Sequence, residues 1–177
     1  MENKFPKNVR QIGNVSDTPK IYVEDYVDTF LNQFCENTEE EINYVFLIGH
    51  TVRQDELDCI YISGALRSAY LGGDRNDVII NQEIWERAEA EKRIYFPDGE
   101  LIGWCMVQKD GILQLQKEWL QMHERYFDRF GTVFILKNPE DEQYFAYKYK
   151  ELMQMNGHYI YYEKNVAMQN YMIMERK

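Results

Sequence analysis

The histidines are the residues of this sequence best suited to metal or acid–base chemistry, and there are three of them: His50, His123 and His158. None has another histidine two, three or four residues away, so no local pair is available to a metal ion. A zinc site needs three or four ligands that converge on one point. The spacing therefore predicts polar side chains at element ends or on surfaces, and it indicates neither a metal site nor a cofactor.

Two further segments contain residue types found in active sites, but in the wrong pattern. LGGDRND (residues 71–77) lacks the GxGxxG and GxxxxGKS/T spacings of phosphate-binding loops and is predicted to be a turn. GALRSAY (residues 64–70) contains a serine without the GxSxG elbow of a hydrolase. Neither segment predicts a nucleotide-binding or nucleophilic site.

Composition limits the classes of partner. The chain has 177 residues, enough for one domain with a substantial core, and a net charge of −10, which disfavours nucleic acid or an anionic membrane as the main partner. The three cysteines are odd in number, and they form no CxxC motif; this favours a reducing compartment. The N-terminal segment has no apolar stretch typical of a signal peptide, and no run has membrane-spanning length. We expect a cytoplasmic protein.

Hydrophobic periodicity predicts alternating helices and strands. Helices are predicted at residues 20–37, 81–96, 112–130 and 166–174, with Gly131 as a helix cap. Strands are predicted at 8–13, 42–52, 57–66, 78–80, 101–108, 132–137, 143–150 and 157–165, the second and third forming a hairpin. The order predicts one α/β domain over residues 20–177, a mixed, twisted β-sheet flanked by helices, preceded by a partly extended arm at 1–19.

Three segments resemble a known family. The strand YVFLIG (residues 44–49), the strand GWCMVQK (residues 103–109) and the segment TVFILKNP (residues 132–139) follow the order of the MPN domain, the fold of the JAMM metalloproteases. The resemblance covers residues 20–150 and implies an MPN/cytidine-deaminase-like fold. The C-terminal segment from residue 157 also resembles bacterial MPN-like proteins.

The residues that carry JAMM chemistry are replaced. Aligned from the Gly-Trp pair, the two zinc-binding histidines of the family become Met106 and Gln108. The family's Ser and Asp fall at Lys117 and Leu120, and its catalytic Glu falls at Ile42. Methionine and glutamine are poor substitutes for imidazole on zinc, so no metal-activated water is expected. The resemblance thus implies a protein that is not an enzyme.

Three functional readings follow. In the first, the chain binds a protein partner or forms a homodimer through exposed C-terminal residues: Tyr161, Tyr162, Met168, Tyr171 and Met172. In the second, the vacated site binds a small ligand. Its lining would be Trp104, Met106 and Leu120, with Met106 close to Leu120.

The third reading is a hydrolase whose site has been rebuilt. Its candidate residues are Asp110, Glu118 and His123. Asp110 is explained by the KDG turn, and Glu118 and His123 are five residues apart on a predicted helix, which does not place them on one face.

Overall fold

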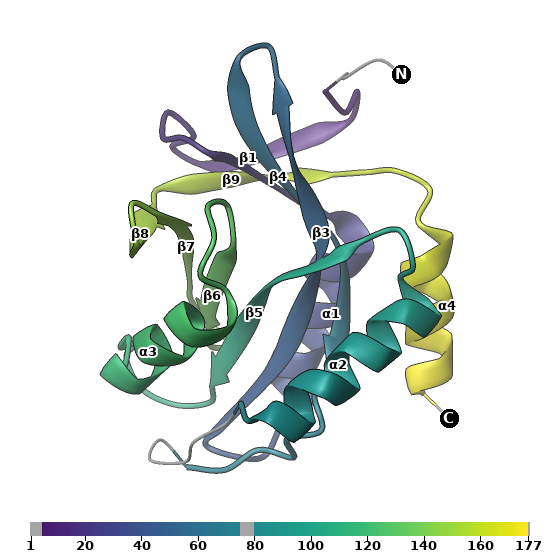
Figure 1. The fold of residues 1–177 in the computed structure, drawn as a ribbon, viewed down its shortest axis with the longest axis vertical. Helices are drawn as coiled ribbons and strands as arrows, with labels where there is room; N and C mark the ends of the chain where they lie inside the picture. Colours follow the sequence, from purple (N-terminus) through teal and green to yellow (C-terminus); the bar gives the residue numbers. More distant parts are fainter. Residues whose placement is uncertain (1–4, 75–79, 177) are drawn as a thin grey trace.

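A nine-stranded mixed β-sheet and four helices make up the described part of the chain, residues 5–74 and 80–176 of a computed structural model (Figure 1). The strands are β1 (Val9–Gly13), β2 (Lys20–Glu24), β3 (Ile42–Gln54), β4 (Leu57–Arg67), β5 (Glu100–Gln108), β6 (Val133–Lys137), β7 (Glu142–Lys148), β8 (Glu151–Met155) and β9 (Gly157–Tyr161). The helices are α1 (Asp25–Asn37), α2 (Gln82–Tyr95), α3 (Lys117–Tyr126) and α4 (Val166–Glu175).

The sheet has the order β1-β9-β2-β4-β3-β5-β6-β7-β8. Strand β2 runs parallel to β4 and β9, and β5 runs parallel to β6, whereas the other neighbouring pairs are antiparallel. The predicted mixed α/β sheet with flanking helices is therefore confirmed. The predicted edge strand in the N-terminal arm is also present, as β1.

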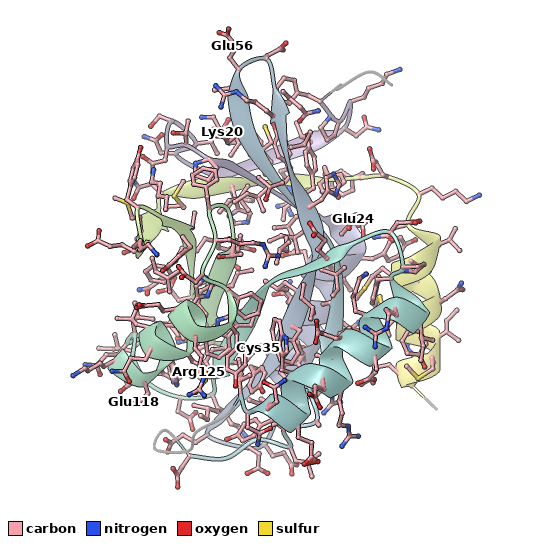
Figure 2. All side chains as sticks on the ribbon, viewed as in Figure 1. Lys20, Glu24, Cys35, Glu56, Glu118 and Arg125 are labelled. Carbon is pink, nitrogen blue, oxygen red and sulfur yellow. The ribbon has the colours of Figure 1, made fainter. Side chains whose placement is uncertain are left out.

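The long β3–β4 hairpin is the centre of the sheet. Its tip projects beyond the other strands, and Glu56 lies at that tip (Figure 2). Asp55 and Glu56 both have positive φ, 47° and 65°, as the two central residues of a tight hairpin turn require.

Helices cover both faces of the sheet. In Figure 1, α2 and α3 lie in front of the strands and α1 lies behind them, while α4 packs against α1, α2 and β4. Side-chain oxygens cap the starts of α2 and α4: Asn81 accepts a hydrogen bond from the Ile84 amide at 2.8 Å, and Asn165 accepts one from the Met168 amide at 3.1 Å. No helix in the described ranges is both long and apolar enough to cross a membrane.

Two glycines are required where strands approach closely. A Cβ atom on Gly49 would lie 1.8 Å from the Tyr61 carbonyl oxygen, and one on Gly103 would lie 2.0 Å from the Val133 carbonyl oxygen. The register of β3 also shifts beside Gly49, which indicates a β-bulge. Both glycines belong to the segments on which the MPN resemblance rests.

Three predictions of local structure are wrong or lie mostly outside the described residues. Residues 20–24 form strand β2, because their alternating Ile21 and Val23 pack into the core while their backbone pairs with β4 and β9. Helix α3 ends at Tyr126, so Gly131 caps no helix, although its φ of 85° does require glycine. The predicted strand at 78–80 lies mostly outside the described residues, and Ile80 belongs to no strand.

Strand β8 was not predicted. It pairs with β7 through a turn at Tyr149 and Lys150, whose φ values are 53° and 62°. Residues with these backbone angles are usually glycine, asparagine or aspartate, so the tyrosine and lysine found here do not predict a turn.

Candidate functional site

The indole of Trp104 on β5 contacts His123 on α3. Its Nε1–H donates a hydrogen bond to His123 Nδ1 at 3.1 Å, and both side chains are fully buried. His123 Nε2 lies 2.9 Å from the Thr132 hydroxyl, which in turn donates to the Phe127 carbonyl at 2.8 Å. Because Nδ1 accepts from the indole, the proton of the neutral ring resides on Nε2, which donates to Thr132.

His123 is uncharged at pH 7. Burial is the main cause and the nearby Arg129 guanidinium acts in the same direction, so that together they lower the pKa of His123 to about 3. Both ring nitrogens are already hydrogen-bonded within the core, so the ring holds α3 on the sheet. We assign His123 a structural role.

Three of the positions that the MPN resemblance predicts for JAMM residues lie near the end of β5. Ile42 and Gln108 are cross-strand partners in the β3–β5 ladder, so the structure brings these two positions together. Ile42, Met106 and Gln108 are fully buried. Gln108 Nε2 donates to the carbonyls of Asp110, at 3.2 Å, and Ile112, at 2.8 Å. The glutamine thus ties down the loop that follows β5.

The other two positions lie elsewhere. Lys117 is exposed at the start of α3, and Leu120 is 38% exposed. Leu120 lines a shallow hollow with Tyr147 and Leu152, near β7 and β8. The described residues contain no group of three or more His, Cys, Asp or Glu side chains placed to hold a metal ion.

The predicted pocket formed by Trp104, Met106 and Leu120 is therefore wrong. Trp104 and Met106 have no exposed surface, whereas Leu120 faces the hollow beside Tyr147. The cause is the phase of α3: its inward residues are Trp119 and His123, four apart, so Leu120 is rotated toward solvent. The expected proximity of Met106 and Leu120 is not supported by this arrangement.

Most of the predicted C-terminal interface is core. Tyr161, Met168 and Tyr171 are at most 3% exposed and Met172 is 9% exposed, whereas Tyr162 is 40% exposed. Met168, Tyr171 and Met172 are the buried residues of α4, which packs against α1, α2 and β4, so they belong to the core. Of the five residues, Tyr162 is exposed, and Met172 keeps only a small exposed edge.

Tyr171 shows why α4 is needed by the fold. Its hydroxyl accepts a hydrogen bond of 2.7 Å from the Arg67 amide, which lies at the last residue of β4. Its ring packs edge-on against Phe30 at 5.9 Å and also contacts Phe96. The helix α4 therefore covers the end of β4 and attaches to it through Tyr171.

The candidate hydrolase residues are not brought together. Glu118 lies on the outer side of α3 and is exposed to solvent (Figure 2). His123 is a buried residue of the same helix. Asp110 is exposed in the turn after β5, where its carbonyl accepts from Gln108. These three residues form no common site.

A second buried polar cluster lies on β6, β7 and β9. Lys137 forms an ion pair of 3.0 Å with Glu142, and His158 Nε2 lies 3.7 Å from the same carboxylate. The His158 ring stacks on Tyr144 with centroids 4.0 Å apart. Burial lowers the pKa of His158 to about 4, despite the neighbouring carboxylate, so this histidine is neutral at pH 7.

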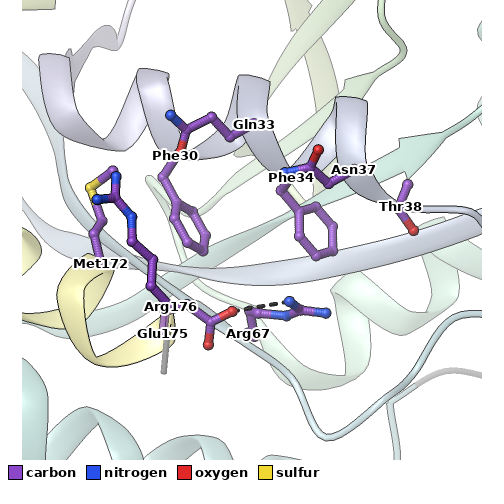
Figure 3. A pocket seen from close by; sticks show the side chains of 9 residues that line it. All are labelled: Phe30, Gln33, Phe34, Asn37, Thr38, Arg67, Met172, Glu175 and Arg176. Carbon is purple, nitrogen blue, oxygen red and sulfur yellow. Dashed lines mark hydrogen bonds and ion pairs between the residues drawn. The ribbon is translucent and has the colours of Figure 1, made fainter.

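A groove that the sequence does not predict lies between α1 and α4 (Figure 3). Its volume is about 240 Å³. Its lining residues are Phe30, Gln33, Phe34, Asn37, Thr38, Arg67, Met172, Glu175 and Arg176. Only the spacing of Phe30 and Phe34 at i and i+4 on a predicted helix hinted at it, and that spacing is equally typical of core residues.

Comparison with known proteins gives the fold alone. No protein-family model matches the chain, and no curated protein matches it. Among solved structures, the chain is similar to the solution structure of protein DSY2949 from Desulfitobacterium hafniense, a target of the Northeast Structural Genomics Consortium. The TM-score is 0.52 and the identity is 10%, over 81% of this chain and 93% of that one.

Proposed function

We propose that this chain is a catalytically inactive, MPN-like protein of the cytoplasm that acts by binding another protein. The observation that carries the proposal is the state of the positions that correspond to the JAMM ligands. Met106 and Gln108 are fully buried, and Gln108 Nε2 donates to two backbone carbonyls. These side chains serve packing and loop attachment, which is what a site released from catalysis would retain.

The chemistry of the donor set supports this proposal. A thioether and an amide oxygen are weak partners for Zn²⁺ compared with imidazole and carboxylate. Ile42, which faces Gln108 across the ladder, has no group that accepts a proton from water. An enzyme of the JAMM type needs both functions at this place.

The small-ligand alternative finds less support at the same position. Trp104 and Met106 have no exposed surface, and Trp104 is hydrogen-bonded to His123 on α3. A ligand there would have to displace buried aromatic side chains, among them Trp119, which is 1% exposed. Binding at the surface requires no such rearrangement.

The test is to identify a partner and reconstitute the complex. The full chain, tagged and produced at its natural level in the cells it comes from, should retain a protein in stoichiometric amount. The two purified proteins should then bind each other with a Kd in the micromolar range or tighter, as measured by calorimetry.

Two results would contradict the proposal. One is a chain that retains no protein in stoichiometric amount and also stays monomeric. The other is turnover of a peptide or isopeptide substrate that requires one bound zinc ion per chain. A homodimer would support the binding function and identify the partner as a second copy.

A further inference from the structure

We propose that the groove between α1 and α4 binds an acidic segment of a partner protein, which inserts one large apolar side chain between Phe30, Phe34 and Met172. This inference rests on the proposed binding function, because it names the kind of protein that is bound. Four features of the groove support it.

The first feature is an apolar floor that is fixed in place. The rings of Phe30 and Phe34 stack with centroids 6.5 Å apart, and Figure 3 shows both pointing from α1 toward Arg67 and Glu175. The two rings and Met172 are each 7–9% exposed, so they are anchored in the core and present only an edge to the groove. A rigid floor lowers the entropic cost of binding.

The second feature is size. The volume of about 240 Å³ lies below the range of about 300–1,000 Å³ that is typical of small-molecule and cofactor sites. A cavity of this size suits a single large side chain. Protein interfaces are commonly anchored in this way, by one apolar or aromatic residue in a pocket.

The third feature is the fixed orientation of the Arg67 guanidinium. Its guanidinium lies 5.2 Å from the centre of the Phe34 ring, and its Nη1 pairs with Glu175 Oε1 at 3.0 Å. These two contacts orient the planar group. Arginine has five N–H donors, so a guanidinium held in this way can also donate hydrogen bonds to a second carboxylate.

The fourth feature is the local charge. The charged residues of the groove are Arg67, Glu175 and Arg176, and within the described ranges the Arg176 side chain forms no ion pair. The groove is therefore locally cationic on a chain whose net charge is −10. At contact distance the local charges dominate, because the screening length is about 8 Å at physiological ionic strength. A carboxylate of the partner is the complementary group.

The experiment is a selection from a displayed library of random decapeptides against the full-length chain. We expect the recovered peptides to be enriched in Asp and Glu next to one Leu, Phe or Met. A fluorescein-labelled recovered peptide should bind wild type and lose at least about tenfold in affinity with Arg176→Glu, because attraction at the groove becomes repulsion. Gln33→Trp, which places a large side chain at the groove, should also abolish binding.

The matched control is Arg93→Glu, which makes the same charge change at an exposed position on α2 outside the groove and should leave the affinity unchanged. Circular dichroism and thermal midpoints verify that each variant is folded. If Gln33→Trp fails to fold, the Arg176→Glu comparison alone decides.

Recovery of no peptide, recovery of basic peptides, or equal binding by wild type and Arg176→Glu would overturn the inference. A concentration-dependent dimer in light scattering that Arg176→Glu dissociates would overturn it too, because the occupant would then be a second copy. The groove and the proposed function can fail independently. A partner protein that wild type and Arg176→Glu retain equally would refute the groove as the binding site and leave the binding function intact.

Discussion

The indole Nε1–H of Trp104 donates a 3.1 Å hydrogen bond to Nδ1 of His123, and neither side chain reaches solvent. This contact joins β5 to α3, the two elements that in the MPN resemblance would frame a metal site. A polar contact in this place stabilises the fold, since a buried acceptor left without a donor loses the free energy of its solvation.

The first prediction concerns this hydrogen bond. Trp104→Phe should lower the free energy of unfolding by about 1–3 kcal/mol more than Trp119→Phe does, as measured by urea denaturation. Trp119 is the matched control because it is also buried, at 1% exposure, and its indole N–H has no hydrogen-bond partner among the described residues. Equal losses in the two variants would show that the Trp104–His123 bond contributes nothing beyond packing.

The second prediction concerns zinc. Protein purified without chelator and dialysed against micromolar zinc should contain far less than one zinc ion per chain, as measured by elemental analysis. The reason is the donor set at the end of β5, where Met106 and Gln108 stand in place of two imidazoles. One zinc ion per chain would contradict the prediction, and loss of that zinc in Gln108→Ala would place it at the end of β5.

The third prediction concerns Gly103. Gly103→Ala should reduce the free energy of unfolding by more than about 3 kcal/mol or prevent folding, which exceeds the effect of ordinary substitutions. The added Cβ would meet backbone, the Val133 carbonyl oxygen at 2.0 Å. Gly99→Ala is the control, since its Cβ would meet the Ile48 Cγ2 methyl at 2.6 Å, and a side chain moves aside more easily than a strand. A similar cost at the two positions would argue against the close approach of β5 and β6.

The elements that the sequence predicts well are those with a strong local signal. Runs rich in β-branched and aromatic residues predict the hairpin of β3 and β4 and the strand β5, and a helical pattern predicts α2. Strand β2 was mistaken for the first turn of a helix, because Val23 continues the apolar stripe of α1 as well as alternating with Ile21. A local pattern does not show that β4 and β9 offer backbone partners on both sides.

The site was harder to predict than the fold, because exposure depends on tertiary packing. The aromatic C-terminal segment suggested an interface, yet Tyr171 fills the space between α1 and α2. His123 looked like a polar residue of a helix surface, and only its contact with Trp104, 19 residues away, shows that it is core. The α1–α4 groove joins Phe34 to Glu175, and nothing in either segment predicts that they meet.

The last prediction concerns acid stability. His158 is buried, and its pKa in the folded protein is about 4, below the value of about 6.5 for an unperturbed histidine. Between these two pH values the unfolded chain binds a proton that the folded chain does not, so acidification favours unfolding. This residue should therefore cost about 2 kcal/mol of stability between pH 7 and pH 5.

Comparison of variants isolates this contribution, because other buried groups also titrate. Burial raises the pKa values of Glu24 and Asp28, so these carboxyls favour the folded state on acidification and partly offset the histidines. The free energy of unfolding should fall by about 2 kcal/mol less between pH 7 and pH 5 in His158→Gln than in wild type. The same substitution at the exposed His50 should leave the wild-type pH dependence in place. The free energies of unfolding of His158→Gln and wild type could instead change in parallel from pH 7 to pH 5. His158 would then bind its proton equally in the folded and the unfolded state, and the close packing of its ring against Tyr144 and Glu142 would not keep it neutral.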